Sequence, residues 1–66
     1  MPEYAHFVSV ARFANLVGLS ERKCWILIGR HELPVYRIGR RTLIKTLEGF
    51  KAIEKLAEAQ ASAQEH

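Results

Sequence analysis

Residues 13–27 read FANLVGLSERKCWIL. This stretch predicts two short helices joined by a tight turn, because Gly18 suits the C-terminal end of one helix and Ser20 can cap the next. Ala14 and Gly18 lie one helical turn apart, which allows a second helix to pack closely against the first. The pattern is typical of a helix-turn-helix, an arrangement that many DNA-binding domains share.

Both predicted helices extend beyond this stretch. The first is expected to open at residues 8–10 with Ser9 as its N-cap, and residues 1–7 are interpreted as a lead-in. The second is expected to run from about Ser20 to Arg30. Its inward face is expected to comprise Cys24, Leu27 and Ile28. On that face Cys24 is a small core residue rather than a nucleophile or a metal ligand.

A β-hairpin and a third helix are expected to follow. Residues 35–38 and 42–45 have strand composition, and 39–41 form the turn between them. The expected core face of the hairpin comprises Tyr36, Ile38 and Ile44. Thr46 is expected to cap a helix that begins at Leu47. The apolar stripe of that helix comprises Leu47, Phe50, Ile53, Leu56 and Ala57.

The expected fold class is mainly α with a short β-hairpin: a winged helix-turn-helix made of two helices, a two-stranded wing and a C-terminal helix. Sixty-six residues make one small domain, which we place at residues 1–56. Residues 57–66 are rich in Ala, Gln, Glu and Ser and have little to pack against. We therefore expect them to form a frayed or partner-dependent helix.

Charge and composition narrow the function. The net charge is +3, but residues 1–45 carry eight basic and three acidic side chains, a balance of +5, whereas residues 46–66 carry two and four, a balance of −2. The positive charge of residues 1–45 favours binding to a polyanion.

One cysteine, no signal-peptide pattern and no apolar stretch of membrane-spanning length predict a cytoplasmic protein with no membrane contact. No His/Cys spacing resembles a metal site, and the small size argues against an enzyme; no metal or cofactor is expected.

Double-stranded DNA is the partner that these features favour, and two sets of residues are candidates to contact it. The major-groove set on the second helix comprises Ser20, Glu21, Arg22, Lys23 and Ile26. The set on the hairpin, for minor-groove or phosphate contact, comprises Arg37, Arg40, Arg41 and Lys45. Arg22 and Lys23 are the main candidates for base edges, and Glu21 either supports the helix N-terminus or accepts from a cytosine amino group. A plain solvated helix face and a turn that merely collects charge are the alternatives.

At this point the chain resembles a known family, the small excisionase-type, MerR-like winged-helix DNA-binding domains of phages and integrative elements, and also AlpA-type prophage regulators. The resemblance runs in one register from Val8 to Phe50. Its most specific part is Leu33-Pro34 followed by Arg37-Ile38-Gly39-Arg40-Arg41. It implies a bacterial or phage-encoded recombination directionality factor that binds near an attachment site, associates cooperatively on DNA and helps a tyrosine or serine recombinase (integrase) to excise a mobile element.

Three residues depart from the family pattern. His31 stands where glycine is usual, so it is expected in a left-handed conformation at some cost. Ile26 and Leu43 stand where polar or basic residues are common, and they suit either a thymine methyl or a protein surface. Two other functions therefore stay open: a small prophage transcriptional regulator with the same DNA-binding mode, and a protein-interaction domain that uses the C-terminal helix.

Overall fold

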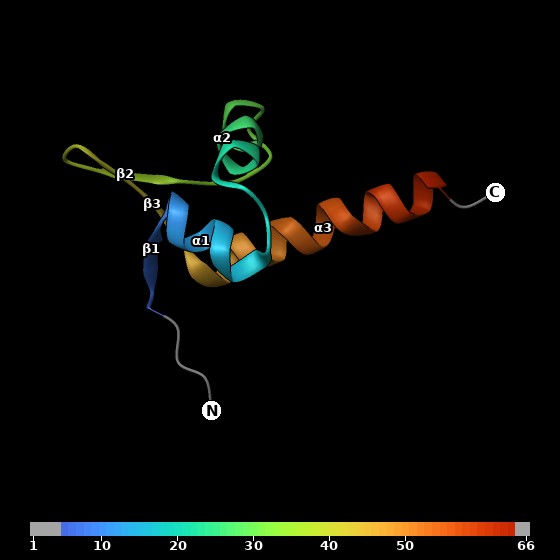
Figure 1. Cartoon of the computed structure of the whole chain (residues 1–66), viewed down its shortest axis with the longest axis horizontal. Coiled ribbons are helices and arrows are strands. Elements are labelled where there is room, and N and C mark those ends of the chain that lie inside the picture. The colour runs from blue at the N-terminus through green and yellow to red at the C-terminus, as the bar shows by residue number, and fades with distance from the viewer. Residues whose placement is uncertain (1–4, 65–66) are drawn as a thin grey trace.

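The computed structural model describes the backbone of residues 5–64 and the side chains of residues 5–60. Its elements, in chain order, are β1 (Phe7–Ser9), α1 (Val10–Val17), α2 (Glu21–Gly29), β2 (Tyr36–Ile38), β3 (Arg41–Lys45) and α3 (Thr46–Gln64). Figure 1 shows the strands at one end of the molecule, α1 beside the first part of α3, and α2 standing above them. The rest of α3 extends away at the opposite end, which makes the molecule longest along that direction.

The two helices predicted from residues 13–27 are confirmed, together with their ends. The Ser9 Oγ accepts a hydrogen bond from the amide of Arg12 at 3.1 Å, and the Ser20 Oγ accepts from the amide of Lys23 at 3.1 Å. Gly18 ends α1 with a φ of 76°, where a side chain would be strained. His31 follows α2 with a φ of 61°, so the predicted left-handed conformation of this residue is also confirmed.

The predicted hairpin of residues 35–45 is present as β2 and β3, but the sheet has a third strand that was not predicted. Phe7, expected at the end of the lead-in, and Val8 and Ser9, expected at the start of the first helix, form β1, and the three antiparallel strands lie in the order β1-β3-β2. Val8 pairs with Ile44, and both side chains are buried, so apolar packing holds the extra strand in place. The amide of Thr46 also donates to the carbonyl oxygen of His6 at 3.0 Å. The fold is therefore mixed α/β rather than mainly α.

The predicted core face of the hairpin is correct only at Ile44. Tyr36 pairs with Leu43 and Ile38 pairs with Arg41, so these side chains share the face of the sheet opposite to Ile44. Tyr36 is 39% exposed and Ile38 is 57% exposed. The hairpin turn comprises Gly39 and Arg40 alone, with Gly39 at a φ of 62°. Arg41, expected in the turn, is instead the first residue of β3.

The core lies between α1, α2, the sheet and the start of α3. Its buried apolar side chains are those of Val8, Val10, Phe13, Ala14, Cys24, Leu27, Leu33 and Ile44. The rings of Phe13 and Phe50 stack with their centroids 5.9 Å apart. Gly49 allows this close approach, because a Cβ atom there would lie 2.8 Å from the Ile44 Cγ2 and would overlap the Phe13 ring.

Thr46 does not cap α3 as predicted. The helix includes Thr46, and its buried hydroxyl donates to the carbonyl oxygens of Ala5, at 2.5 Å, and His6, at 3.3 Å. Thr46 thus ties the start of α3 to the chain that leads into β1. Beyond Leu56 the helix continues to Gln64, and residues 57–60 are exposed. Residues 1–4 of the predicted lead-in and 65–66 of the predicted tail lie outside the described residues.

Candidate nucleic-acid interface

The packing of the buried side chains of α2 determines which of its residues are exposed. Cys24 and Leu27 anchor the helix in the core, at 0% and 6% exposure. Arg22 and Ile26 lie one turn apart on the other side of the helix, and both are exposed. The capping hydrogen bond of Ser20 fixes where the helix begins and therefore where Arg22 stands. The two side chains form a ridge on the side of α2 opposite to its buried face.

Glu21 and Trp25 interact with each other on a second side of α2. The indole Nε1 of Trp25 donates to the Glu21 Oε2 at 3.3 Å, and the Trp25 side chain is 42% exposed. Glu21 also lies in the first turn, where a carboxylate complements the helix dipole. Its carboxylate therefore has a role within the protein, which favours the supporting interpretation of Glu21 over direct contact with a cytosine.

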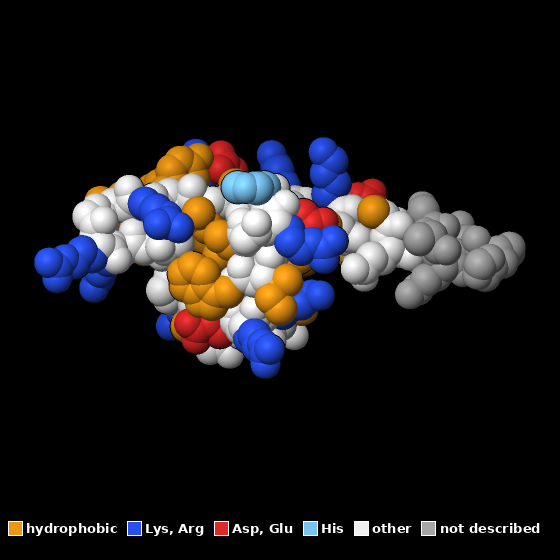
Figure 2. Space-filling view, turned by 90° about the horizontal axis from the view of Figure 1, so that it is seen from above, with side chains coloured by type: hydrophobic (Ala, Val, Ile, Leu, Met, Phe, Trp, Pro, Cys, Tyr) orange, Lys and Arg blue, Asp and Glu red, His pale blue; other side chains and the backbone are white. Residues whose placement is uncertain are grey.

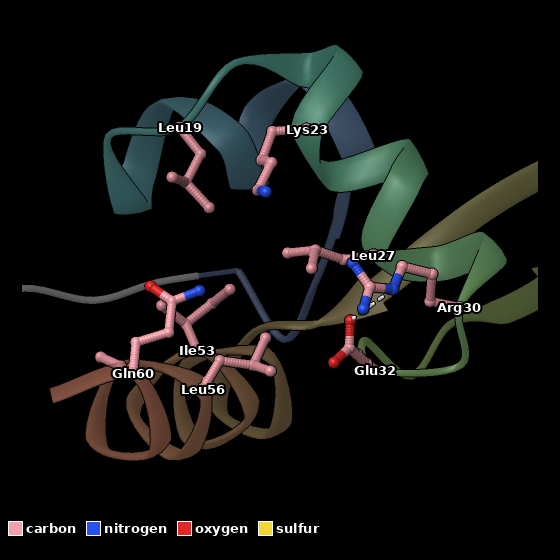
Figure 3. A pocket seen from close by; sticks show the side chains of 9 residues that line it. Leu19, Lys23, Leu27, Arg30, Glu32, Ile53, Leu56 and Gln60 are labelled. Atoms are coloured by element: carbon pink, nitrogen blue, oxygen red, sulfur yellow. Dashed lines mark ion pairs between the residues drawn. The ribbon is translucent and has the colours of Figure 1, made fainter. Parts of the chain in front are cut away.

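Lys23 does not share a face with Arg22. Its side chain comes from α2 and points into the groove between α2 and α3 (Figure 3). The apolar part of this groove comprises Leu19, Leu27, Ile53, Leu56 and Ala57. Arg30 stands at the same groove and forms an ion pair with Glu32, with 3.3 Å between Nε and Oε1. A helical step of about 100° per residue separates the directions of adjacent side chains, which accounts for the divergence of Arg22 and Lys23.

The cations of the hairpin are divided between the two faces of the sheet. Arg37 pairs with Thr42, and so shares the face of the buried Ile44 on which the helices pack. Arg41 pairs with Ile38 on the opposite, outer face, and Arg40 occupies the turn. Figure 2, seen from the side on which α2 stands, shows Lys and Arg side chains at the far end of the hairpin and around α2, with hydrophobic side chains between them.

Lys45 lies at the base of the hairpin, away from Arg40. It belongs to the outer face, opposite Phe7, and its Nζ lies 3.7 Å from the Glu48 Oε2. The Tyr36 hydroxyl donates to the Glu48 Oε1 at 2.9 Å. This hydrogen bond, helped by burial and by the charge of Glu48, raises the pKa of Tyr36 above its ordinary value. The Tyr36 ring also contacts that of Phe7 edge to face, with centroids 5.4 Å apart.

The sequence-based selection of residues missed Arg30 and Gly29 as neighbours of the site. Arg30 is exposed at the end of α2 and lines the same side of the groove as Lys23, and its spacing of seven from Lys23 signals a shared helix face. Gly29 lies on the exposed side, and a Cβ atom there would meet nothing within 4 Å. The ridge of Arg22 and Ile26 is thus followed by a position with no side chain, where another molecule can approach the backbone closely.

Cys24 and the acidic residues provide no visible chemistry. Burial, followed by the charge of Glu21, raises the pKa of the Cys24 thiol, which keeps it protonated and unreactive. Within residues 5–64, no group of three His, Cys, Asp or Glu side chains is placed to hold a metal ion. No helix in that same range combines the length and apolar character needed to cross a membrane.

Comparison of the chain with protein-family models, with curated proteins and with solved structures finds no match.

Proposed function

We propose that this chain is a sequence-specific double-stranded DNA-binding protein of the winged helix-turn-helix type, with α2 as the recognition helix and the β2–β3 hairpin as the wing. One observation carries this proposal. Arg22 on the ridge of α2 and Arg40 in the turn of the hairpin are both exposed, and Figure 2 shows further Lys and Arg side chains around α2 and at the far end of the hairpin. An α-helix fits the width of a major groove, and an arginine at a hairpin tip suits the negative potential of a narrow minor groove.

Arg22 and the hairpin would serve different parts of binding. We assign Arg22 to contact with a base edge, where a bidentate arginine–guanine pair discriminates between bases. Arg37 shares the sheet face on which the helices pack, and Arg40 occupies the tip, so both suit phosphate or minor-groove contact. Arg41 and Lys45 stand on the outer face, and Lys45 is already paired with Glu48. We therefore assign them a weaker share of DNA contact than Arg37 and Arg40.

The biological task that we propose is that of an excisionase, or recombination directionality factor. Its support is the resemblance of residues 8–50 to that family, together with the small size of the domain. A domain this small covers little DNA, so strong specific binding requires several copies side by side. Such an array near an attachment site would bend DNA and help an integrase to excise. A prophage-type transcriptional regulator would use the same surface on DNA.

Salt-dependent titration of DNA tests the binding mode. The wild-type chain, Arg22→Ala, Arg40→Ala and the control Lys51→Ala are titrated with duplex DNA over a range of salt concentrations. Arg40→Ala should reduce the slope of log K against log salt by about 0.9 for each phosphate contact that is lost. Arg22→Ala should reduce the preference for the specific site. Lys51 lies on the acidic α3 and should have no effect. Unchanged affinity in both arginine variants would overturn the proposal.

An excision assay separates the two biological tasks. The integrase of the same element is supplied with recombined attachment-site DNA, with and without the protein. An excisionase should raise the yield of excised product, and Arg22→Ala should lose that effect. A protein that binds the same region and changes transcription of a reporter, but leaves the excision yield unchanged, is the regulator instead.

A second candidate function is favoured by α3. This helix continues past Leu56 with exposed residues 57–60, beside an apolar groove that faces α2. A helix that extends beyond its own core suits a protein partner such as the recombinase. Ala57→Arg, which fills this groove with charge, should block such a partner without lowering DNA affinity. If it does so while both arginine variants keep normal DNA affinity, the interaction domain is the correct function.

A further inference from the structure

The exposed ridge of α2 contains a large apolar side chain next to a cation. Ile26 is 44% exposed, on the side of the helix that faces away from the buried Cys24 and Leu27. Arg22 is exposed one turn earlier, and it has no ion-pair partner among the described residues. A surface that joins an aliphatic group to an unpaired guanidinium requires a ligand with both an apolar and an anionic or acceptor group.

The DNA major groove presents both kinds of group side by side. A guanine offers two acceptors at its edge, and a thymine offers a C5-methyl group, the only aliphatic group in the groove. A protein surface that covered Ile26 would also have to remove water from Arg22 and supply a carboxylate in its place. The ridge also ends at Gly29, which carries no side chain and has open space around it, so a ligand can approach the helix backbone there. These features favour a groove over a flat protein surface.

We propose that Ile26 contacts the methyl group of a thymine and thereby helps to determine the DNA sequence that this chain binds. The inference rests on the proposed DNA-binding function. Four residues of helix rise about 6 Å, and stacked base pairs are about 3.4 Å apart. The thymine therefore lies within about two base pairs of the base pair that Arg22 contacts. In this arrangement Arg22 reads a base by hydrogen bonds and Ile26 reads a nearby thymine by apolar contact.

Replacement of thymine by deoxyuridine tests this inference, because it removes only the methyl group. Duplexes are first selected from a randomised pool with the full wild-type chain. Each thymine of the selected site is then replaced in turn by deoxyuridine, and the affinity of the wild-type chain and of Ile26→Ala is measured. At one thymine the replacement should weaken wild-type binding about fourfold, as expected for one methyl group removed from an apolar contact. Ile26→Ala should bind the thymine and deoxyuridine duplexes equally.

Two controls accompany the measurement. Leu47→Ala removes an aliphatic side chain that is 61% exposed at the start of α3, and should leave the thymine preference unchanged. Thermal unfolding of Ile26→Ala should match that of the wild type, because the side chain is exposed. The inference is overturned if no thymine in the site responds to deoxyuridine, or if Ile26→Ala keeps the full response. In either case, a site whose binding still depends on Arg22 leaves the proposed function standing. A pool from which no sequence is enriched would overturn the proposed function itself.

Discussion

Helix α2 and the β2–β3 hairpin are both basic and exposed, but they are held in place in different ways. Two side chains of α2, Cys24 and Leu27, are buried in the core, so the direction of every exposed side chain on the helix follows from packing. In contrast, all three residues of β2 are exposed, and only Ile44 of β3 is buried. The hairpin is held by its strand pairing, by that one buried side chain and by the contacts of Tyr36 with Phe7 and Glu48.

Under the proposed function, this difference would serve two kinds of DNA contact. Base reading requires a side chain at a fixed position, and a packed helix provides it. Phosphate contact and entry into a minor groove depend on charge and tolerate small shifts, which a lightly anchored hairpin allows. We therefore expect core substitutions beneath α2 to lower the free energy of unfolding much more than substitutions in the hairpin. Surface substitutions on α2 should reduce the preference for a specific DNA site, and those on the hairpin should reduce the salt-dependent affinity.

The largest expected effect is on the anchoring of α2. Leu27→Ala should lower the free energy of unfolding by about 3 kcal/mol, because it leaves a cavity beneath the helix. Ile38→Ala in the hairpin should change it by less than about 0.5 kcal/mol, since that side chain is already 57% exposed. Urea unfolding followed by circular dichroism measures both values. Equal costs for the two variants would contradict the proposed difference in anchoring.

The cap of α2 provides the next test. Ser20→Ala should lower the free energy of unfolding by about 1 kcal/mol, because the amide of Lys23 loses its hydrogen-bond acceptor. Ser20→Asp should retain most of the stability, since aspartate also accepts this hydrogen bond. Unfolding in urea again gives the values. If alanine and aspartate prove equivalent at this position, the cap does not stabilise α2 as proposed.

The same contrast explains which parts of the fold were predictable from the sequence. The ends of α1 and α2 were predictable, because capping residues such as Ser9, Gly18 and Ser20 form hydrogen bonds with backbone groups only a few residues away. Strand β1 was not, because three residues carry too short a pattern and only pairing with β3 makes them a strand. The faces of the hairpin were also misassigned, since Tyr36 and Ile38 have the composition of core residues but their register places them outside.

In the candidate site too, features that depend on nearby residues were predictable from the sequence, and contacts between distant elements were not. Arg22 and Ile26 were both predicted in the DNA-contacting set of the second helix, and in the structure they lie one turn apart on its exposed side. The divergence of Lys23 from Arg22 follows from helical periodicity, but the groove that Lys23 enters depends on where α3 lies, which no local pattern specifies. The hydrogen bond of Tyr36 with Glu48 and the exposure of Trp25 likewise depend on the packing of separate elements. Local chemistry was therefore predictable, and the arrangement between elements was not.

A substitution at His31, between α2 and the hairpin, should raise the free energy of unfolding, whereas the substitutions above lower it. His31 connects α2 to the segment before the hairpin at a φ of 61°, a conformation that costs a non-glycine residue about 1–2 kcal/mol. His31→Gly removes this cost but adds freedom to the unfolded chain, so the net gain should be about 0.5 kcal/mol. Thermal unfolding measures it, and His31→Ala, which keeps the strain, is the control. A loss of stability in the glycine variant would show that the His31 side chain itself stabilises the junction.

The smallest effect should come from the outer face of the hairpin, where the Tyr36 hydroxyl donates to Glu48. This hydrogen bond, the main cause of the shift, raises the pKa of Tyr36 above the usual 10.0. The folded chain therefore holds the phenolic proton more tightly than the unfolded chain. The resulting stability is fully present below pH 10 and is lost as the pH rises through the raised pKa.

The ring resonances of Tyr36 in an NMR titration report that pKa directly. Glu48→Gln should lower it toward the usual value, whereas Glu54→Gln, at an exposed position elsewhere on α3, should leave it unchanged. A pKa that does not respond to Glu48→Gln would mean that the contact is too weak to hold β2 against α3, and that strand pairing alone positions the outer strand of the hairpin.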